Sequence, residues 1–225
     1  MKKIWIVLAV VLALVLLVIA LYPREGSGDP FDIYVPGGEP GGMVVDKPVI
    51  YLYPEQETEV DVWLDYNGSL LCTYPAYEGG WHVTARPDGT LIDQATGKEY
   101  SYLFWEGSSN VAYDLSSGYV VAGEDTAAFL QETLAAMGLT PKEYNEFIVY
   151  WLPKMQGNAY NLITFQTTAY TESARLTVSP QPDSVLRIFM AWQALAAPIE
   201  VEKPTIQPFV REGFVVVEWG GTEIR

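Results

Sequence analysis

The sequence predicts an α+β domain of mainly antiparallel β-sheets with a two-helix insert, preceded by an N-terminal transmembrane helix. Three observations predict this fold class: an apolar run begins the chain, short alternating segments bounded by turn residues fill most of the rest, and two helical patterns lie together at about residues 125–152. Because helices and strands do not alternate along the chain, a doubly wound parallel sheet is not expected.

The first segment is an unbroken apolar run from Ile4 to Leu21, preceded by Lys2 and Lys3. As a helix its roughly 18 residues measure about 27 Å, which just crosses the ~30 Å hydrocarbon core of a bilayer. The two lysines predict a cytoplasmic N-terminus and an extracytoplasmic domain. We therefore expect residues 1–21 to be a signal-anchor that holds a single-pass protein in the cell membrane through residues 4–21.

A cleaved signal peptide is the alternative interpretation. Val18-Ile19-Ala20 has acceptable small residues at the −3 and −1 positions of a cleavage site. The protein would then be secreted. Both interpretations place the domain outside the cytoplasm.

Residues 22–45 are expected to form a linker, because proline and glycine are too dense there for a helix or a sheet. From residue 46 to residue 225 nothing marks a second boundary, so we expect a single extracytoplasmic domain. With 49% of the chain hydrophobic, a domain of this length can bury one substantial core.

The first strands are predicted from alternation and turn residues. Val49–Tyr53 is a strand closed by a proline, and Thr58–Tyr66 alternates apolar with acidic positions. Asn67-Gly68 then predicts a tight hairpin turn, because both residues tolerate positive φ. The returning strand is expected at Leu70–Tyr74.

A second hairpin is expected around the turn Pro87-Asp88-Gly89, between the strands Trp81–Ala85 and Thr90–Ile92. The remaining strands are expected at Tyr100–Trp105, Gly118–Val121, Leu162–Thr167, Ala174–Val178, Val185–Trp192 and Phe214–Trp219.

The insert consists of two predicted helices. The first covers about Thr126–Met137 and ends before Gly138. The second begins with Thr140-Pro141-Lys142-Glu143, a capping box with proline at the first helical position. Pro153 is expected to end it.

Composition excludes several classes of protein. The net charge is −15, with 13 Lys and Arg against 28 Asp and Glu, so a duplex nucleic-acid binder, which needs a basic patch, is not expected. One cysteine excludes an internal disulfide framework and zinc sites built on several thiolates, and one histidine excludes a site that needs two. We expect no cofactor.

Five strings resemble those of a bacterial family: Lys47 to Pro54, Cys72 to Tyr77, Tyr102 to Glu106, Phe147 to Pro153, and Phe214 to Glu223, which ends Val-Glu-Trp-Gly-Gly-Thr-Glu. The family consists of uncharacterised, often exported proteins whose domain begins with Lys-Pro-Val-Ile-Tyr-Leu-Tyr-Pro. The resemblance covers about residues 47–223. It implies a single domain of that family, but no activity and no functional residue.

A pair of acids is the strongest catalytic candidate. A glycosidase needs two carboxylates on either side of a sugar bond, one of them kept protonated by apolar neighbours. Glu106 follows Trp105 and Glu218 precedes Trp219, so both acids have aromatic neighbours. A structural role for both carboxylates is the simpler interpretation.

Other chemistry is predicted more weakly. His82 and Cys72 are the lone imidazole and thiol, but no string around them matches a known nucleophile motif. Relatives often have asparagine in place of His82, which argues against a catalytic role for it. Glu57, Glu59 and Asp61 follow one strand face and are candidates for Ca²⁺, although a solvated acidic face explains them equally well.

Aromatic side chains are the candidates for ligand binding. Exposed rings form a platform for sugar faces or for a protein partner, although strands also use aromatics in the core. The candidates beside turns and strand ends are Tyr77, Trp81, Trp105 and Trp219.

The leading hypothesis is therefore a membrane-tethered extracytoplasmic binding domain at the cell surface, without catalysis, whose ligand is wall polysaccharide or a surface protein. The alternatives are a carboxylate-based glycan hydrolase and an accessory subunit of an envelope complex. The sequence carries no signal for an oligomeric state.

Overall fold

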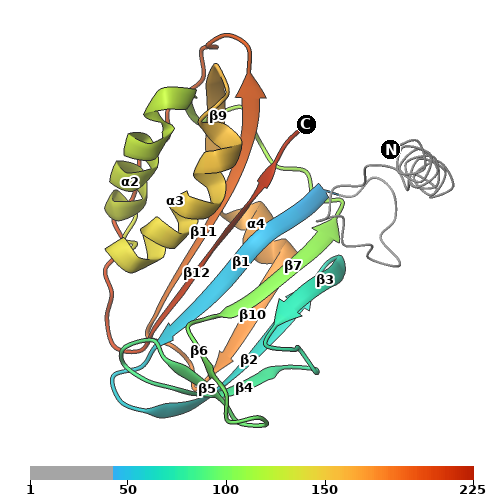
Figure 1. The fold of residues 1–225 in the computed structure, drawn as a ribbon, viewed down its shortest axis with the longest axis vertical. Helices are drawn as coiled ribbons and strands as arrows, with labels where there is room; N and C mark the ends of the chain where they lie inside the picture. The colour runs from blue at the N-terminus through green and yellow to red at the C-terminus, as the bar shows by residue number, and fades with distance from the viewer. Residues whose placement is uncertain (1–42) are drawn as a thin grey trace, which may run out of the picture. The chain divides into compact units, whose positions relative to one another are not determined.

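Two β-sheets and a helix pair make up the part of the chain described by a computed structural model, residues 43–225 (Figure 1). The predicted anchor at residues 1–21 and residues 22–42 of the predicted linker lie outside the described residues. The predicted linker boundary at residue 45 is wrong, because residues 43–45 already pair as the start of the first strand of the domain. Between Met43 and Arg225 no helix is long and apolar enough to cross a membrane. Mainly antiparallel sheets with few helices confirm the α+β class.

The larger sheet has seven strands in the order β3-β7-β1-β12-β11-β9-β8. Every neighbouring pair is antiparallel except β11 and β12, which are parallel. The strands are β1 (Met43–Tyr53), β3 (Ser69–Tyr74), β7 (Leu103–Ser109), β8 (Tyr119–Ala122), β9 (Tyr160–Gln166), β11 (Ser184–Leu195) and β12 (Val215–Glu223).

The smaller sheet has five strands in the order β10-β2-β4-β5-β6, all antiparallel. They are β2 (Thr58–Tyr66), β4 (Trp81–Ala85), β5 (Leu91–Asp93), β6 (Glu99–Tyr100) and β10 (Ala174–Ser179). The β4–β5 hairpin was predicted, and its turn has Gly89 at φ 88°.

Two cores hold the layers together. One face of the seven-stranded sheet packs on the five-stranded sheet through Ile50, Trp105 and Phe189 against Val62 and Trp81, among others. The opposite face packs on α2 (Thr126–Ala136) and α3 (Pro141–Met155). Strand β12 lies between both cores, so all its residues except the last are buried.

The predicted helix pair is confirmed, and the capping box is present at Thr140 and Glu143. Two helical segments were not predicted: the 3-10 turn η1 (Gly123–Asp125) and the short α4 (Thr168–Ser173). The prediction that Pro153 ends the second helix is wrong, because α3 continues to Met155. Proline so near a helix end removes only one backbone hydrogen bond, and Asn161 Nδ2 donates to the terminal carbonyl of Met155 at 3.0 Å.

The predicted hairpin at Asn67-Gly68 is also wrong. Strand β2 pairs with β4 and β10 in the small sheet, whereas β3 pairs with β7 in the large sheet. The two residues instead carry the chain from one sheet to the other, and the Asn67 N–H donates to the Ser173 carbonyl at 2.7 Å. A β-carbon on Gly68 would lie 2.3 Å from the Ser108 carbonyl oxygen, so glycine permits this close passage.

The predicted strand Tyr100–Trp105 is likewise divided between the sheets. Tyr100 ends β6 in the small sheet, and Leu103 begins β7 in the large one. Residues 101–102 make the crossing, which alternation alone does not distinguish from a continuous strand.

A buried ion pair fastens the helix pair to the segment that precedes β12. Glu143 is fully buried, and it accepts hydrogen bonds from the Thr140 N–H at 2.7 Å and from the Arg211 guanidinium. Arg211 also donates to the Gly138 carbonyl at 2.9 Å. Removing one partner of such a pair leaves a buried charge without compensation.

We expect Arg211→Met to lower the free energy of unfolding by about 3 kcal/mol, because the Glu143 carboxylate loses its cation. Urea denaturation measures the change. The control is Arg175→Met, whose partner Asp65 lies 3.9 Å away with both side chains exposed. That variant should change stability by less than about 0.5 kcal/mol, and similar losses for the two variants would contradict the expectation.

Candidate functional site

The predicted acid pair does not share a cleft. Glu218 on β12 is fully buried between the two sheets, where it accepts hydrogen bonds from Trp105 Nε1 at 3.1 Å and Arg187 Nε at 2.5 Å. Glu106 follows Trp105 on β7, so its side chain points to the opposite face of the same sheet. A glycosidase needs both carboxylates at one sugar bond, so these two acids do not form the predicted catalytic pair.

The predicted ring platform is not formed by the residues named for it. Trp81, Trp105 and Trp219 are buried, each at 1% exposure or less. Tyr77 is half-buried, and its hydroxyl donates to the Leu64 carbonyl at 3.2 Å. These four rings stabilise the cores, as strand aromatics commonly do.

The acidic strand makes ion pairs in place of a Ca²⁺ site. Glu57 accepts from Arg86 Nε at 2.9 Å, and Asp61 Oδ1 lies 2.5 Å from His82 Nδ1. Glu59 is exposed. Among residues 43–225 no group of three or more His, Cys, Asp or Glu side chains could hold a metal ion. His82 lies on the small sheet with Asp61 as its partner, whereas the free, exposed Cys72 lies on the large sheet, and no hydrogen bond joins these two side chains.

A different site forms where β1 is interrupted by a bulge. The pairing of β1 with both neighbouring strands shifts register before Val49, and Lys47 has φ 51°, a left-handed conformation that is uncommon for lysine. A strained backbone conformation persists only where the surrounding structure holds it in place. Such conformations, like bulges, are frequent at functional sites.

Two glycines of β12 permit close packing beside this bulge. A β-carbon on Gly220 would lie 3.0 Å from Pro48 Cα, and one on Gly221 would lie 2.7 Å from Trp151 Cζ2 and 2.6 Å from the Met190 carbonyl oxygen. The strings noted in the sequence around Lys47, Trp151 and Trp219 therefore contact one another in the fold. Their residue types are required by close packing at this point.

Two lysines lie over aromatic rings beside the bulge. Lys47 Nζ lies 5.1 Å from the Tyr150 ring centroid, and Lys154 Nζ lies 4.2 Å from the same ring. Lys154 also lies 3.8 Å from Asp46 Oδ2. Cation–π contacts hold both ammonium groups near the sheet surface while leaving donors for other groups.

Glu106 belongs to this cluster. Burial raises the pKa of its carboxyl, and the negative charge of Asp46 raises it further, while the Lys47 backbone N–H and the two lysines oppose the rise. Burial likewise raises the pKa of Asp46, against the attraction of Lys154. The cluster therefore combines two carboxyls that resist ionisation with two cations.

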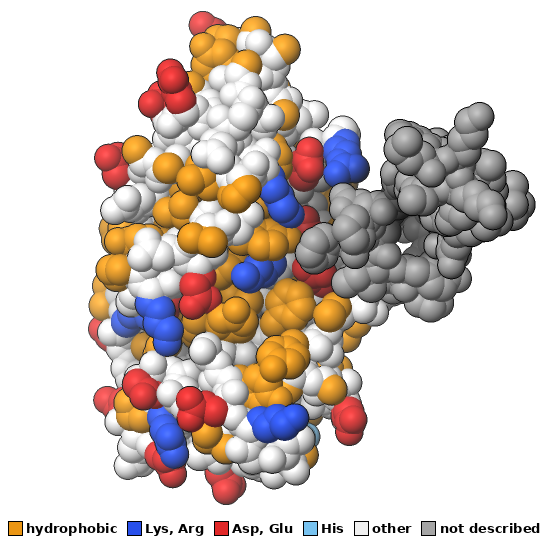
Figure 2. Space-filling model, viewed as in Figure 1, with side chains coloured by type: hydrophobic (Ala, Val, Ile, Leu, Met, Phe, Trp, Pro, Cys, Tyr) orange, Lys and Arg blue, Asp and Glu red, His pale blue; other side chains and the backbone are white. Residues whose placement is uncertain are grey.

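A surface of aromatic side chains extends from this cluster, because no helix between residues 43 and 225 covers β7 and β3. Tyr74 lies opposite Phe104 across the β3–β7 pair and is 61% exposed, and Val149 on α3 is 74% exposed. Figure 2 shows hydrophobic side chains gathered on this face with charged groups among them. We call this surface the open face and define it as Lys47, Tyr74, Tyr102, Phe104, Glu106, Val149 and Tyr150.

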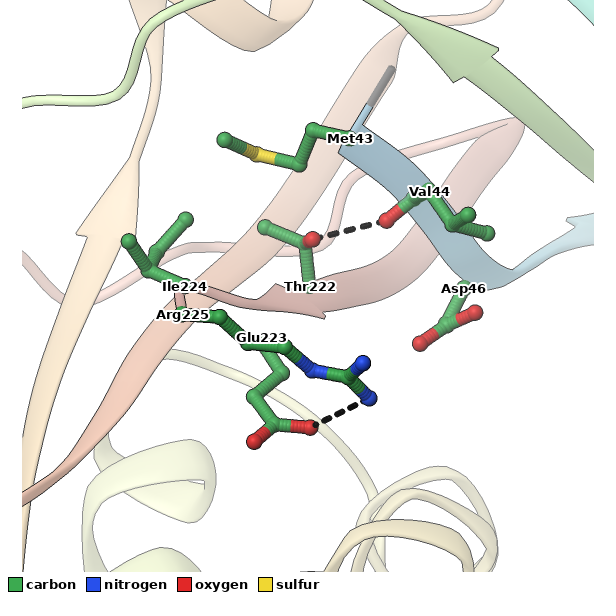
Figure 3. Close-up of a pocket in the computed structure, with 7 residues that line it drawn as sticks. All are labelled: Met43, Val44, Asp46, Thr222, Glu223, Ile224 and Arg225. Carbon is green, nitrogen blue, oxygen red and sulfur yellow. Dashed lines mark hydrogen bonds and ion pairs between the residues drawn. The ribbon is translucent and has the colours of Figure 1, made fainter. Parts of the chain in front are cut away.

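Two hollows adjoin the open face. One of about 410 Å³ lies between Lys47, Tyr102, Glu146 and Tyr150. The other, also about 410 Å³, lies where β1 begins and β12 ends, beside Asp46 (Figure 3). There Arg225 Nη2 lies 3.5 Å from Glu223 Oε2, and the guanidinium points between the carboxylates of Glu223 and Asp46. These groups offer both hydrogen-bond donors and acceptors to a ligand.

Sequence reasoning missed the open face. The string from Tyr102 to Glu106 contains three of its residues, but alternation alone does not say which face of a sheet lies uncovered. The left-handed Lys47 had no sequence signal other than its place in the string Lys-Pro.

Comparisons with known proteins assign no activity. No protein-family model matches the chain, and no solved structure matches it. The chain is similar to a protein of Butyrivibrio fibrisolvens described as an uncharacterized protein in the bglA 3'region, with 50% identity over 64 residues. The match covers 27% of this chain and 65% of that protein.

We expect Gly221→Ala to lower the free energy of unfolding by about 1–3 kcal/mol, because the new methyl group meets a backbone carbonyl and the Trp151 ring. Urea denaturation measures it. Gly157→Ala is the matched control, since a β-carbon there has no neighbour within 4 Å. A Gly221→Ala protein as stable as the control would show that β12 can shift away from Met190.

Glu106→Gln should raise stability at neutral pH, because it replaces a carboxylate whose ionisation is unfavourable in the folded state. The folded-state pKa lies above its ordinary value of 4.5, so folding takes up a proton between these two values and stability falls as pH rises through that window. Denaturation from pH 4 to pH 8 should show a shallower fall for the variant.

The control for this pH series is Glu55→Gln, at an exposed acid, which should change stability by less than about 0.5 kcal/mol. A Glu106→Gln protein that is less stable than the parent at pH 7 would contradict the expectation. It would mean that the hydrogen bond from the Lys47 N–H outweighs the cost of burial.

Proposed function

We propose that this protein is a membrane-tethered, extracytoplasmic binding domain at the cell surface, and that it binds wall polysaccharide through the open face. The observation that carries the proposal is a row of partly exposed rings beside clustered carboxyls and lysines, on a sheet surface that none of the described helices covers. A surface protein is the alternative ligand.

The chemistry of the open face suits a sugar polymer. Aromatic rings present flat apolar faces on which sugar rings stack, and Tyr74 and Phe104 lie side by side across two paired strands. Glu106 can accept hydrogen bonds from sugar hydroxyls, and Lys47 can donate hydrogen bonds to them. Because the chain carries a net charge of −15, a neutral polymer is favoured over a strongly anionic one.

The sequence supports the location. The apolar run at residues 4–21, with lysines before it, is typical of a signal-anchor with its domain outside the cytoplasm. A proline- and glycine-rich linker would let the domain stand away from the lipid. An extracytoplasmic domain on such a tether can reach the wall.

The hydrolase alternative has no observation in its favour. Glu218 is neutralised by Arg187 between the sheets, and Glu106 lies on the other face. Binding without turnover is the simpler role for the open face.

We expect the full-length protein in detergent micelles to co-sediment with isolated cell-wall material in a saturable manner, and Tyr74→Ala with Phe104→Ala to weaken the binding about tenfold. Each ring contributes roughly 0.5–1.5 kcal/mol through its contacts, and about 1.4 kcal/mol is a factor of ten. Trp63→Ala is the control, because Trp63 is a partly exposed ring on the small sheet.

The measurement is made with Ca²⁺ and with chelator. Equal binding in both conditions would agree with the ion pairs of Glu57 and Asp61. Absence of saturable binding in either condition would overturn the polysaccharide version and leave a protein ligand for the open face. Equal losses in the Trp63 variant and the double variant would show that the open face is not the site.

A further inference from the structure

Strand β11 is paired along different parts of its length on its two sides. On one side β12 pairs with it from Ser184 to Trp192. On the other side β9 pairs with it only from Phe189 to Leu195. Between Ser184 and Ile188, no strand in the described part of the chain pairs with the β9 side of β11.

The gap arises because β9 stops at Gln166. The chain then enters α4 and passes to β10 in the small sheet. The edge of β11 is therefore free in the middle of one side of the sheet, and Val185 on it is 46% exposed. A free edge offers unpaired backbone N–H and C=O groups to another chain.

A hollow lies on each side of this free edge. The larger, about 560 Å³, is lined by Phe165, Leu186, Ile188 and Ile206, among others. The smaller, about 330 Å³, is lined by residues that include Leu176 and Val178 of β10. Both are lined by Val185 and Arg187. Successive side chains of a strand point to opposite faces, so one added strand would place alternate side chains in the two hollows.

The lining is uncharged except for Arg187. Neither hollow has an Asp or Glu in its wall, although the chain has 28 acids. Arg187 is neutralised by Glu218 and its side chain is only 10% exposed. Free edges are usually protected by charged side chains or proline, and the free segment has no exposed charge.

Arg187 also has an unused donor. Its Nη2 is buried and has no hydrogen-bond partner among the described residues. Its guanidinium lies 4.9 Å from the Tyr170 ring centroid, so the charge of Arg187 is directed into the interior and not toward the edge.

We propose that the free edge Ser184–Ile188 binds an uncharged, extended segment of a partner protein, which adds a strand beside β11 in line with β9. About five residues pair with the edge, and their apolar or β-branched side chains alternate between the two hollows. This site is separate from the open face and goes beyond the proposed function.

The test selects peptides from a phage library of random 12-residue sequences on the full-length protein in detergent micelles. Selected peptides should share a segment of about five residues that alternates apolar side chains and lacks Asp, Glu, Lys and Arg. Alternate backbone amides of the bound peptide face the edge of β11. N-methylation of those amides should weaken binding at least tenfold. Methylation of the other amides should have little effect, because they point away from β11.

Val185→Lys should weaken the selected peptide at least tenfold, since it places a charge on the edge. Thr177→Lys, at an exposed residue that lines the smaller hollow, is a second variant in case the first does not fold. Val149→Lys, on the open face, is the control and should bind the selected peptide as tightly as the parent does. Wall co-sedimentation of the Val185 and Thr177 variants should be unchanged, which separates this proposal from the proposed function.

Three results would overturn the proposal. The first is a selection without a shared uncharged segment. The second is a peptide that binds equally well when either set of alternate amides is methylated. The third is a dimer of the full-length protein that Val185→Lys dissociates, because the edge would then pair with a second copy of the chain.

Discussion

Two helices cannot cover one face of a seven-stranded sheet, and this shortage of cover leaves exposed the surface for which we propose binding. The outer strands of such a sheet lie about 29 Å apart, at ~4.8 Å per strand, whereas two packed helices span about 20 Å at ~10 Å each. Here α2 and α3 pack mainly over residues of β12, β11 and β9. The strands β7 and β3 lie at the other end of the sheet order and remain open on that face.

The bulge at Lys47 marks the boundary between the covered and the open parts of this face. On one side of it Trp151 of α3 and Trp219 of β12 are fully buried where the helix packs on the sheet. On the other side Glu106 and Phe104 are only partly covered. Pro48 approaches β12 so closely that a β-carbon in place of Gly220 would have to displace it. The left-handed lysine thus places a cation over Tyr150 at the point where the core gives way to a surface.

Much of the fold could be predicted from the sequence, because the signals for single elements are local. Alternation gave β2 its bounds, a glycine turn gave the β4–β5 hairpin, and a capping box gave the start of α3. The partner of each strand could not be predicted in the same way. Asn67-Gly68 permits a hairpin, but it equally permits a crossing between sheets, and only the packing of two cores decides between them.

The same limit applies to the candidate site. Glu106 and Glu218 look alike in sequence, since each is an acid beside a tryptophan on a strand. Glu218 turns toward the interior and is paired with Arg187. Glu106 turns toward the uncovered face, where Lys47 and Asp46 lie around it. Local sequence does not contain this difference, because it depends on which layer covers each face.

The free edge of β11 and the open face have one origin, although the binding that we propose for each uses different groups. In both places the large sheet lacks a neighbour among the described residues. No helix layer lies over β7 and β3, and no strand lies beside Ser184–Ile188 on the β9 side. A face without a helix presents side chains, so it discriminates ligands by rings and charges. An edge without a strand presents the backbone, so it accepts any extended segment whose side chains fit the adjoining hollows. The two proposed sites use different parts of the sheet, so the proposed binding of a wall polymer at one does not require the other to be empty.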